Sequence, residues 1–191
     1  AGPAGAVTNE NGQVLITQTA VNAGSITPGD TPGFPVTISQ PGSYRLASNL
    51  AVTTSANGIE VRANDVSIDM GGFTLAGSGV GRNGIAIFNR TLRVTNGNVR
   101  GFTNDGIRSI APYLTVDNMI ISSNGRVGIY ADRGPIGGRN DVAYASFSAN
   151  KVTYNGSSGI ICGDVCRVEN SMVASNSGTG ISFNGVDGFA L

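Results

Sequence analysis

Apolar and polar residues alternate in short stretches along most of this chain, and the stretches recur with a nearly constant period. Each period begins with a glycine followed by an isoleucine. The six pairs are Gly58-Ile59, Gly84-Ile85, Gly106-Ile107, Gly128-Ile129, Gly159-Ile160 and Gly180-Ile181. The intervals between their glycines are 26, 22, 22, 31 and 21 residues. Such a period is typical of repeat proteins, in which each repeat packs against its neighbours.

Three pairs of apolar residues, each pair spaced by two positions, fall within each period. Residues two apart in a strand point to the same face, so each pair predicts a short strand with an inward face. The first strand starts at the isoleucine, the second lies about eight residues after the glycine, and the third follows it closely. The pairs of the second strand are Val66/Ile68, Leu92/Val94, Leu114/Val116 and Cys166/Val168.

Three strands within about 22 residues leave no room for helical crossovers, so the chain must wind as a coil. Each strand then lies parallel to its counterpart in the next coil, about 4.8 Å away. The pattern predicts an all-β fold, a right-handed parallel β-helix of about six coils over residues 36–191. Its inward columns of isoleucine, valine and leucine fill a packed core.

Asparagines recur at two registers in the turns. One series follows the second strand and consists of Asn96, Asn118 and Asn170; the other precedes the next glycine–isoleucine pair and consists of Asn124, Asn155 and Asn176. Asparagine tolerates left-handed turn geometry, and stacked asparagines can hydrogen-bond from coil to coil. We therefore predict a structural role for both series.

Residues 1–35 do not fit the period. They contain one strand-like run, residues 13–19, and a turn-rich segment, residues 25–33, and we interpret them as a cap for the first coil. No capping helix follows the last coil, so we expect either that the natural chain continues or that another chain covers this edge, which is a template for strand addition. The apolar residues expected to take part in end-to-end association are Val14, Ile16, Ile181, Phe183 and Phe189.

The composition excludes several classes of partner. Twelve basic residues balance twelve acidic residues in 191, so the chain has no electrostatic reason to bind nucleic acid. No apolar run reaches the roughly 20 residues of a membrane span. The small, uncharged start resembles the mature end left by signal-peptide cleavage, which predicts a secreted or surface-bound bacterial protein.

The repeats resemble the right-handed parallel β-helix proteins of the pectin-lyase-like superfamily, over residues 36–191. The Asn57-Gly58-Ile59, Asn83-Gly84-Ile85 and Asp105-Gly106-Ile107 starts and the asparagine turns carry the resemblance, together with residues 35–46, which look like the first turn of secreted members. The resemblance implies the fold, and its members include lyases, hydrolases, adhesins and tailspikes, so activity must be argued from a site. The chain has no histidine and lacks the hydrolase motifs.

An acidic column is the first candidate for chemistry. Asp69, Asp117 and Glu169 lie on the outer face of the second strand, with Arg93 and Arg167 close by. Acids two coils apart are separated by roughly 9–10 Å, too far for easy sharing of one Ca²⁺. We therefore interpret the column as a solvated face with cross-strand ion pairs, and we predict no metal site and no cofactor.

The long fourth interval is the second candidate. It contains about nine extra residues within 132–141, and an insertion on a rigid scaffold is a common place for function. The candidate residues are Tyr130, Asp132, Arg133, Arg139, Asp141 and Tyr144. They could form a ligand site with tyrosines that stack on sugars, a subunit interface, or a tolerated insertion.

The two cysteines, Cys162 and Cys166, occupy inward columns on either side of one turn. In an oxidising compartment we expect them to form a disulfide, which would close a short loop and constrain little chain.

Two functions from different classes remain open. The first is a secreted, non-catalytic structural protein, a block of a surface layer, fibre or adhesin whose partners are copies of itself. The second is a carbohydrate-active protein, either a polysaccharide lyase or a polysaccharide-binding module, with Arg108, Arg133 or Arg139 meeting the carboxylates near residues 130–144. The missing catalytic motifs favour the first.

Overall fold

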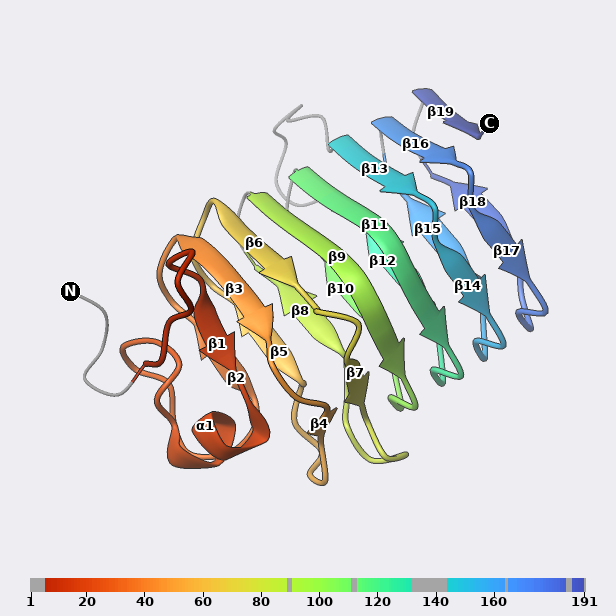
Figure 1. Cartoon of the computed structure of the whole chain (residues 1–191). Helices are drawn as coiled ribbons and strands as arrows, with labels where there is room; N and C mark the ends of the chain where they lie inside the picture. The colour runs from red at the N-terminus through yellow and green to blue at the C-terminus, as the bar shows by residue number, and fades with distance from the viewer. Residues whose placement is uncertain are drawn as a thin grey trace.

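The chain winds into a parallel β-solenoid of about five turns, where the repeats predict about six. The computed structural model describes residues 6–88, 91–110, 113–131, 144–163, 165–184 and 187–190. Figure 1 shows the coils following one another from the N-terminal to the C-terminal end, with each strand beside its counterpart in the next coil. The predicted all-β solenoid is confirmed.

The isoleucines of the repeat start the strands of a seven-stranded parallel sheet. Its members in chain order are β2 (Val36–Ile38), β5 (Ile59–Val61), β8 (Ile85–Ile87), β10 (Ile107–Ser109), β12 (Ile129–Ala131), β15 (Ile160–Cys162) and β18 (Ile181–Phe183). Equivalent residues of successive coils pair directly, for example Ile107 with Ile129.

The second and third strands of each coil form a twelve-stranded sheet. Its main path consists of β1 (Val14–Ile16), β3 (Gly42–Leu46), β6 (Val66–Asp69), β9 (Thr91–Arg100), β11 (Tyr113–Ser122), β13 (Tyr144–Ser148), β16 (Val165–Glu169) and β19 (Asp187–Ala190). Its side branch consists of β4 (Leu50–Ala51), β7 (Thr74–Ala76), β14 (Lys151–Thr153) and β17 (Met172–Ala174). In β9 and β11 the predicted second and third strands run together as one bent strand.

The inward columns fill the space between the sheets. Residues such as Ile59, Ile107 and Val116 are completely buried, and Phe102, Phe147 and Tyr44 are large aromatic side chains within the core. Large apolar side chains removed from water in this way supply most of the stabilisation of a solenoid.

The glycines of the first five glycine–isoleucine pairs, Gly58 to Gly159, are required by the close approach of the next coil, whereas a Cβ on Gly180 would meet only ordinary contacts. A Cβ atom on Gly106 would lie 2.7 Å from the carbonyl oxygen of Gly128, and one on Gly128 would lie 2.7 Å from that of Gly159. Such contacts are repulsive, so any other residue would force the coils apart. Glycine at this position is therefore a steric requirement wherever another coil stacks on it.

One asparagine series forms the predicted ladder between coils. Asn155 Oδ1 accepts hydrogen bonds from the backbone N–H of Asn124 at 3.1 Å and from its Nδ2 at 3.0 Å. Asn176 Oδ1 accepts the equivalent bonds from Asn155 at 3.0 and 2.9 Å. Asn124 and Asn155 are buried, so the ladder satisfies polar groups that water cannot reach.

The other series supplies the bend after the second strand. Asn96, Asn118 and Asn170 have φ values of 62°, 52° and 49°, in the left-handed region that asparagine tolerates. Both predicted roles for asparagine are thus confirmed.

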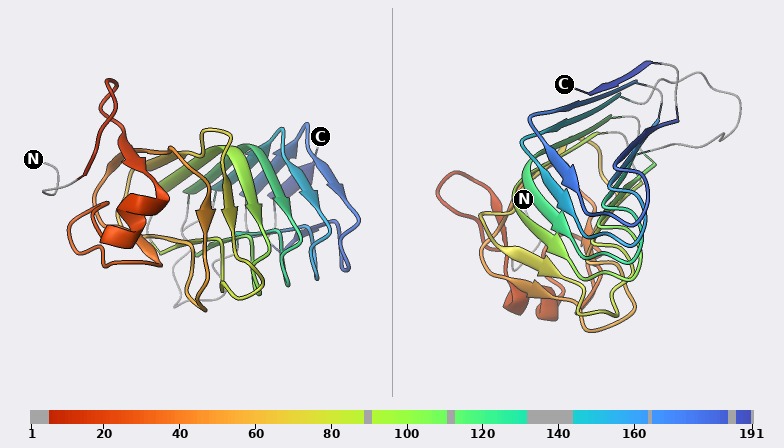
Figure 2. Two further views of the ribbon diagram at one scale, coloured as in Figure 1. Left: turned by 60° about the horizontal axis from the view of Figure 1, so that its bottom comes forward. Right: turned by 90° about the vertical axis from the view of Figure 1, so that its right-hand side faces the viewer.

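The N-terminal residues cover the first coil, as Figure 2 shows from two further directions. Strand β1 pairs in parallel with β3, and residues 7–9 fold back along β1, with Leu15 N–H donating to the Val7 carbonyl at 2.8 Å. The strand predicted over 13–19 is shorter, because Gln18 begins the helix α1 (Gln18–Ala23). The Thr17 hydroxyl caps that helix by accepting from Ala20 N–H, and Gly24 ends it at φ 65°.

A buried carboxylate joins the cap to the first coil. Asp30 accepts hydrogen bonds from the backbone N–H groups of Thr37 at 2.8 Å and Ile26 at 3.2 Å. Burial raises the pKa of the Asp30 carboxyl above its ordinary value of 3.8, although hydrogen bonds from Thr37 and Ile26 act in the opposite direction.

We predict that Asn155→Ala lowers the free energy of unfolding by about 2–4 kcal/mol, because it leaves the backbone N–H and the Nδ2 of the buried Asn124 without their shared acceptor. Denaturant unfolding would measure the change. Asn98→Ala is the matched control, since the half-buried Asn98 side chain makes a 3.4 Å bond to Thr74. Equal costs for the two variants would contradict the ladder's role.

We predict that the Asp30 side chain stabilises the fold most at low pH. A carboxyl whose pKa is raised by folding holds its proton more tightly in the folded state, so its contribution is complete below the unfolded pKa and falls as pH rises through the folded value. The wild type should therefore lose stability relative to Asp30→Asn between about pH 3 and pH 7. Thermal unfolding of both proteins across this interval measures the difference between their melting temperatures. A difference that does not change with pH would contradict the prediction.

Candidate functional site

The outer face of the seven-stranded sheet presents one side chain from the middle of each strand. This column consists of Thr37, Glu60, Ala86, Arg108, Tyr130, Ile161 and Ser182, which pair in register from coil to coil. Its central members bring a cation and an aromatic ring together on adjacent strands.

A depression of about 220 Å³ opens on this face. Its polar lining comes from two arginines and two asparagines, and its apolar lining comes from four residues. The polar residues are Arg82, Arg108, Asn57 and Asn83, and the apolar residues are Ala86, Ile87, Phe88 and Ile110. Phe88 is 46% exposed, so an apolar surface stands open to solvent beside two guanidinium groups.

Arg108 is held in position from two sides. Its Nη1 donates to Oδ2 of Asp105 at 3.0 Å, and its Cζ lies 4.6 Å from the centroid of the Tyr130 ring. The Asp105 side chain is 1% exposed, which makes this carboxylate a buried anchor for a half-exposed cation. A guanidinium stacked on a ring and fixed by a carboxylate keeps few alternative rotamers.

Asp105 belongs to a second ladder, at the residue preceding the repeat glycine. Asn57 Oδ1 accepts from the N–H and Nδ2 of Asn83, Asn83 Oδ1 accepts from the N–H of Asp105, and Asp105 Oδ1 accepts from the N–H of Val127. The carboxylate therefore replaces an amide in a ladder that otherwise serves only stacking. Its second oxygen is free to bind Arg108.

Arg82 contrasts with Arg108. Its side chain is exposed and makes no ion pair or side-chain hydrogen bond with the described residues. The backbone hydrogen bonds from Arg126 to Asn104 and from Asn104 to Arg82 place Arg82 and Arg126 in one column, two coils apart. Two coils correspond to roughly 9–10 Å between their Cα atoms. Arg126 is likewise exposed and without such a partner among those residues.

The charge of Arg62 at the edge of this face is largely balanced. Its Nη2 lies 2.7 Å from Oε2 of Glu60, and its Cζ lies 5.4 Å from the centroid of the Phe88 ring. Glu60 also accepts a hydrogen bond from Asn57 Nδ2 at 2.9 Å. The unpaired positive charge of the described face therefore resides on Arg82 and Arg126.

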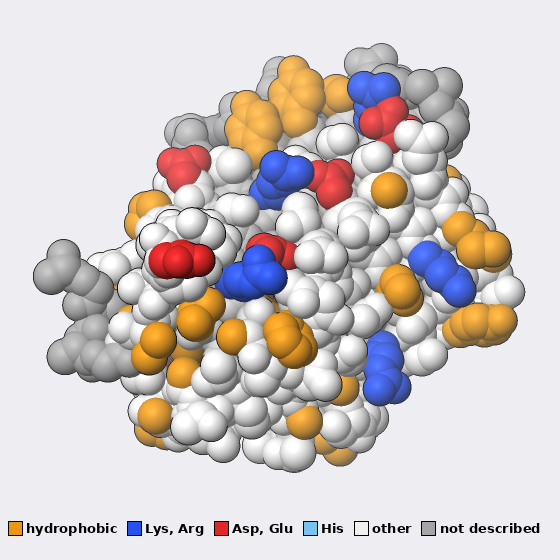
Figure 3. Space-filling view, in the orientation of Figure 1, with side chains coloured by type: hydrophobic (Ala, Val, Ile, Leu, Met, Phe, Trp, Pro, Cys, Tyr) orange, Lys and Arg blue, Asp and Glu red, His pale blue; other side chains and the backbone are white. Residues whose placement is uncertain are grey.

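The acidic column lies on the other sheet, and each of its acids has an arginine partner. The N···O distances are 2.6 Å for Arg45–Asp69, 3.2 Å for Arg93–Asp117 and 2.5 Å for Arg167–Glu169. Figure 3 shows these basic and acidic side chains in adjacent pairs across this face. The predicted cross-strand ion pairs are confirmed for Arg45–Asp69 and Arg93–Asp117, whereas Arg167 and Glu169 pair within β16. The described residues contain no group of three His, Cys, Asp or Glu that could hold a metal ion.

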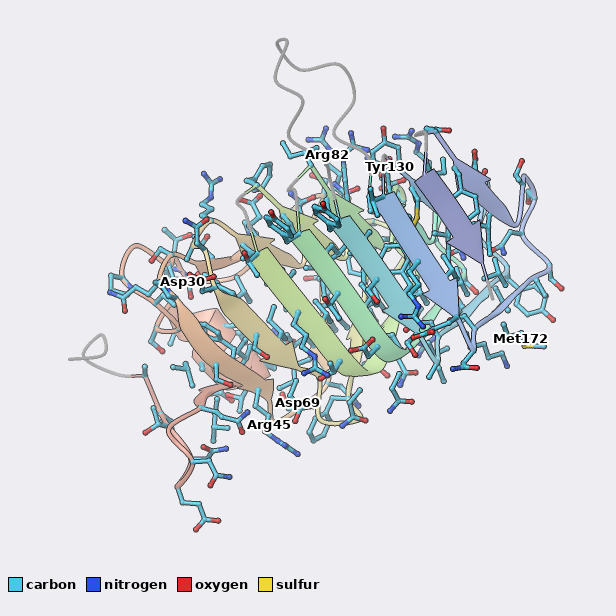
Figure 4. All side chains as sticks on the ribbon, turned by 90° about the horizontal axis from the view of Figure 1, so that it is seen from above. Asp30, Arg45, Asp69, Arg82, Tyr130 and Met172 are labelled. Carbon is cyan, nitrogen blue, oxygen red and sulfur yellow. A yellow bond between two sulfur atoms is a disulfide. The ribbon has the colours of Figure 1, made fainter. Side chains whose placement is uncertain are left out.

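The two tyrosines beside the fourth-coil insertion lie on different sheets. Tyr130 is in β12 under Arg108, whereas Tyr144 begins β13 and stacks on Tyr113 with ring centroids 5.6 Å apart. Figure 4 shows Arg82 and Tyr130 at one margin of the solenoid and Arg45 and Asp69 at the other. The remaining predicted residues of this group, Asp132, Arg133, Arg139 and Asp141, lie outside the described residues.

The residues predicted for end-to-end association fall into two groups. Val14 and Ile16 lie in β1, which pairs with β3, and Ile16 is completely buried in the chain's own core. Ile181 and Phe183 lie in β18, where they are half-buried. Phe189 lies in β19, and its side chain is outside what the structure describes.

The predicted disulfide is present. Cys162 and Cys166 are bonded across a sequence separation of four, and both are completely buried. A loop of this length constrains little chain, so the bond fixes one turn and adds little to global stability.

The chain matches no family model, no curated protein and no solved structure. The solenoid therefore rests on the structure itself, while membership of the pectin-lyase-like superfamily, bacterial origin and secretion stay predictions. Within the described residues, no helix has the length and apolar character needed to cross a bilayer.

Arg108 and Tyr130 were predicted from the sequence as candidate residues, whereas Arg82, Phe88 and the two asparagines of the depression were not. A signal was present in the polar residue that precedes the repeat glycine at Asn57, Asn83 and Asp105. A polar residue repeated at that register predicts a hydrogen-bonded ladder between coils. Its one acidic member, Asp105, is the residue that binds Arg108.

We predict that Asp105→Ala lowers the free energy of unfolding by about 2–3 kcal/mol, because it leaves the Val127 N–H and the Arg108 guanidinium without their partner. Asp105→Asn should lower the free energy of unfolding by less than half as much, since an amide oxygen occupies this register at Asn57 and Asn83. Denaturant unfolding of both variants measures the two losses of stability. A cost for asparagine equal to that of alanine would show that the carboxylate, and not the ladder, dominates.

Proposed function

We propose that this protein is a non-catalytic solenoid that binds an acidic polysaccharide on the outer face of its seven-stranded sheet. The observation that carries the proposal is the exposed Arg82, which has no ion-pair partner among the described residues and shares a depression with Arg108 and the exposed ring of Phe88. A guanidinium binds carboxylate and sulfate groups through paired hydrogen bonds, and an apolar wall suits the C–H face of a sugar ring.

The arrangement of the cations supports a polymer as the ligand. Arg82 and Arg126 repeat along the solenoid axis, and Arg108 lies on the strand between them. A chain with anionic groups at regular intervals could contact several coils at once, and the effective concentration of the second contact would raise the overall affinity.

The lining of the depression supports binding over catalysis. Its described lining residues include arginine and asparagine but no Asp, Glu, Lys or Tyr, which are the usual proton donors and acceptors of acid–base chemistry. The nearest buried acid, Asp105, already holds Arg108 and the Val127 N–H. A polysaccharide lyase acting on the same face is the alternative within this class.

A structural role through end-to-end association is a separate proposal. The pairing of β1 with β3 means that residues 14–16 would have to leave their own chain to join another. Deleting residues 1–20 and comparing particle size before and after would test it, and a monomer in both cases would count against it.

We predict that Arg82→Ala weakens binding of polygalacturonate, alginate or a glycosaminoglycan by about tenfold, because one charge-assisted contact is lost. Calorimetry or affinity electrophoresis would measure the change. Arg93→Ala is the matched control, since Arg93 is exposed on the other sheet and pairs with Asp117.

Binding should also weaken with added salt, and uncharged dextran should not bind. Absence of binding across the acidic panel would contradict the proposal. Appearance of the ultraviolet absorbance of an unsaturated product would replace it with the lyase alternative.

A further inference from the structure

Two exposed tyrosines lie side by side on neighbouring coils of the twelve-stranded sheet. Tyr113 in β11 and Tyr144 in β13 are direct partners in the parallel register. Their ring centroids are 5.6 Å apart, and the planes differ by 2°. The two residues are 48% and 50% exposed, so solvent reaches both phenols.

The other three tyrosines have no such neighbour among the described residues. Tyr44 is 2% exposed and donates its hydroxyl to the Gln40 carbonyl at 2.8 Å. Tyr130 lies under Arg108, and Tyr154 is 67% exposed but stands alone. All five tyrosines of the chain are described, so Tyr113 and Tyr144 form its one stacked pair of phenols.

The chain offers few competing sites for oxidation. It contains no tryptophan and no histidine, and both cysteines are held in the disulfide. Of its three methionines, Met70 and Met119 are buried, and Met172 is 58% exposed. A one-electron oxidant therefore meets mainly exposed phenols, because a thioether reacts more readily by oxygen transfer to its sulfoxide.

We propose that Tyr113 and Tyr144 are a site of oxidative cross-linking, at which a peroxidase-type oxidant joins them as dityrosine within one chain. Each phenol loses one electron and one proton to give a phenoxyl radical. The two radicals couple through a carbon ortho to each oxygen, and the product returns to the phenol form by a proton shift. Hydrogen peroxide accepts the two electrons and two protons and becomes two molecules of water, so the reaction balances.

The geometry favours coupling within the chain. The register sets the two rings at the spacing of neighbouring strands, and rotation about the broad χ2 torsion of half-exposed rings brings their ortho carbons edge to edge. A radical formed on one ring therefore has its partner in contact before a second molecule can arrive.

The bond would have a structural consequence. It would join β11 to β13 and close the chain between residues 113 and 144, a far longer loop than the separation of four that the disulfide spans. Longer closed loops remove more entropy from the unfolded state, so this link would stabilise the solenoid more than the disulfide does.

The test is to treat dilute protein with a haem peroxidase and hydrogen peroxide. The wild type should give a monomer lighter by two hydrogen atoms, with dityrosine fluorescence and a peptide that links Tyr113 to Tyr144. The melting temperature of this product should rise by about 10 °C. A mass loss without the linked peptide would overturn the proposal.

Tyr113→Phe and Tyr144→Phe should each abolish the cross-linked monomer while keeping the fold, since phenylalanine preserves the ring. Tyr154→Phe is the matched control and should leave the product unchanged, because that exposed tyrosine has no stacked partner. Cross-linked dimers that depend on Tyr154, with no linked monomer, would contradict the proposal. Circular dichroism of each variant shows that a lost product does not come from unfolding.

Discussion

Neighbouring coils of this solenoid meet so closely at one corner that a single atom of side chain would separate them. The first five repeat glycines each lie under the carbonyl of the next one, and a Cβ on Gly106 would approach the Gly128 oxygen to 2.7 Å. This corner sets the height of every coil and aligns the isoleucines that follow it. The backbone pairing of the two sheets and the inward columns depend on that alignment.

Close stacking also buries backbone N–H groups in the turns between strands. Ladders of side chains supply the hydrogen-bond acceptors for these groups. The Asn124–Asn155–Asn176 ladder and the Asn57–Asn83–Asp105 ladder both direct a side-chain oxygen at a backbone N–H of an adjacent coil. In the second ladder each coil contributes one side-chain oxygen as acceptor. A carboxylate can therefore replace an amide where its second oxygen binds a cation. Asp105 meets this condition through Arg108, and a stacking element thereby becomes the anchor of a surface arginine.

The surface follows a different rule from the core. On the twelve-stranded sheet each acid of the column meets an arginine, while the exposed Arg100 and Lys151 make no ion pair with the described residues. On the seven-stranded sheet Arg82 and Arg126 have no such partner among the described residues, and apolar Phe88 stands beside Arg82. Because the whole chain carries twelve charges of each sign, this local imbalance is invisible in the composition.

Periodicity alone was enough to predict the solenoid, its parallel strands and both asparagine roles, because each of these repeats at a fixed distance along the chain. The disulfide was predicted instead from the positions of Cys162 and Cys166 on either side of one turn. The helix α1 was missed although Thr17 and Gly24 mark its ends, since a six-residue helix has too few turns to show a period. The depression with Arg82 could not be predicted, because its walls come from three coils and meet only after stacking. The pairing of Tyr144 with Tyr113, and not with Tyr130, was likewise decided by the tertiary structure: strand register, not distance along the chain, determines which side chains touch.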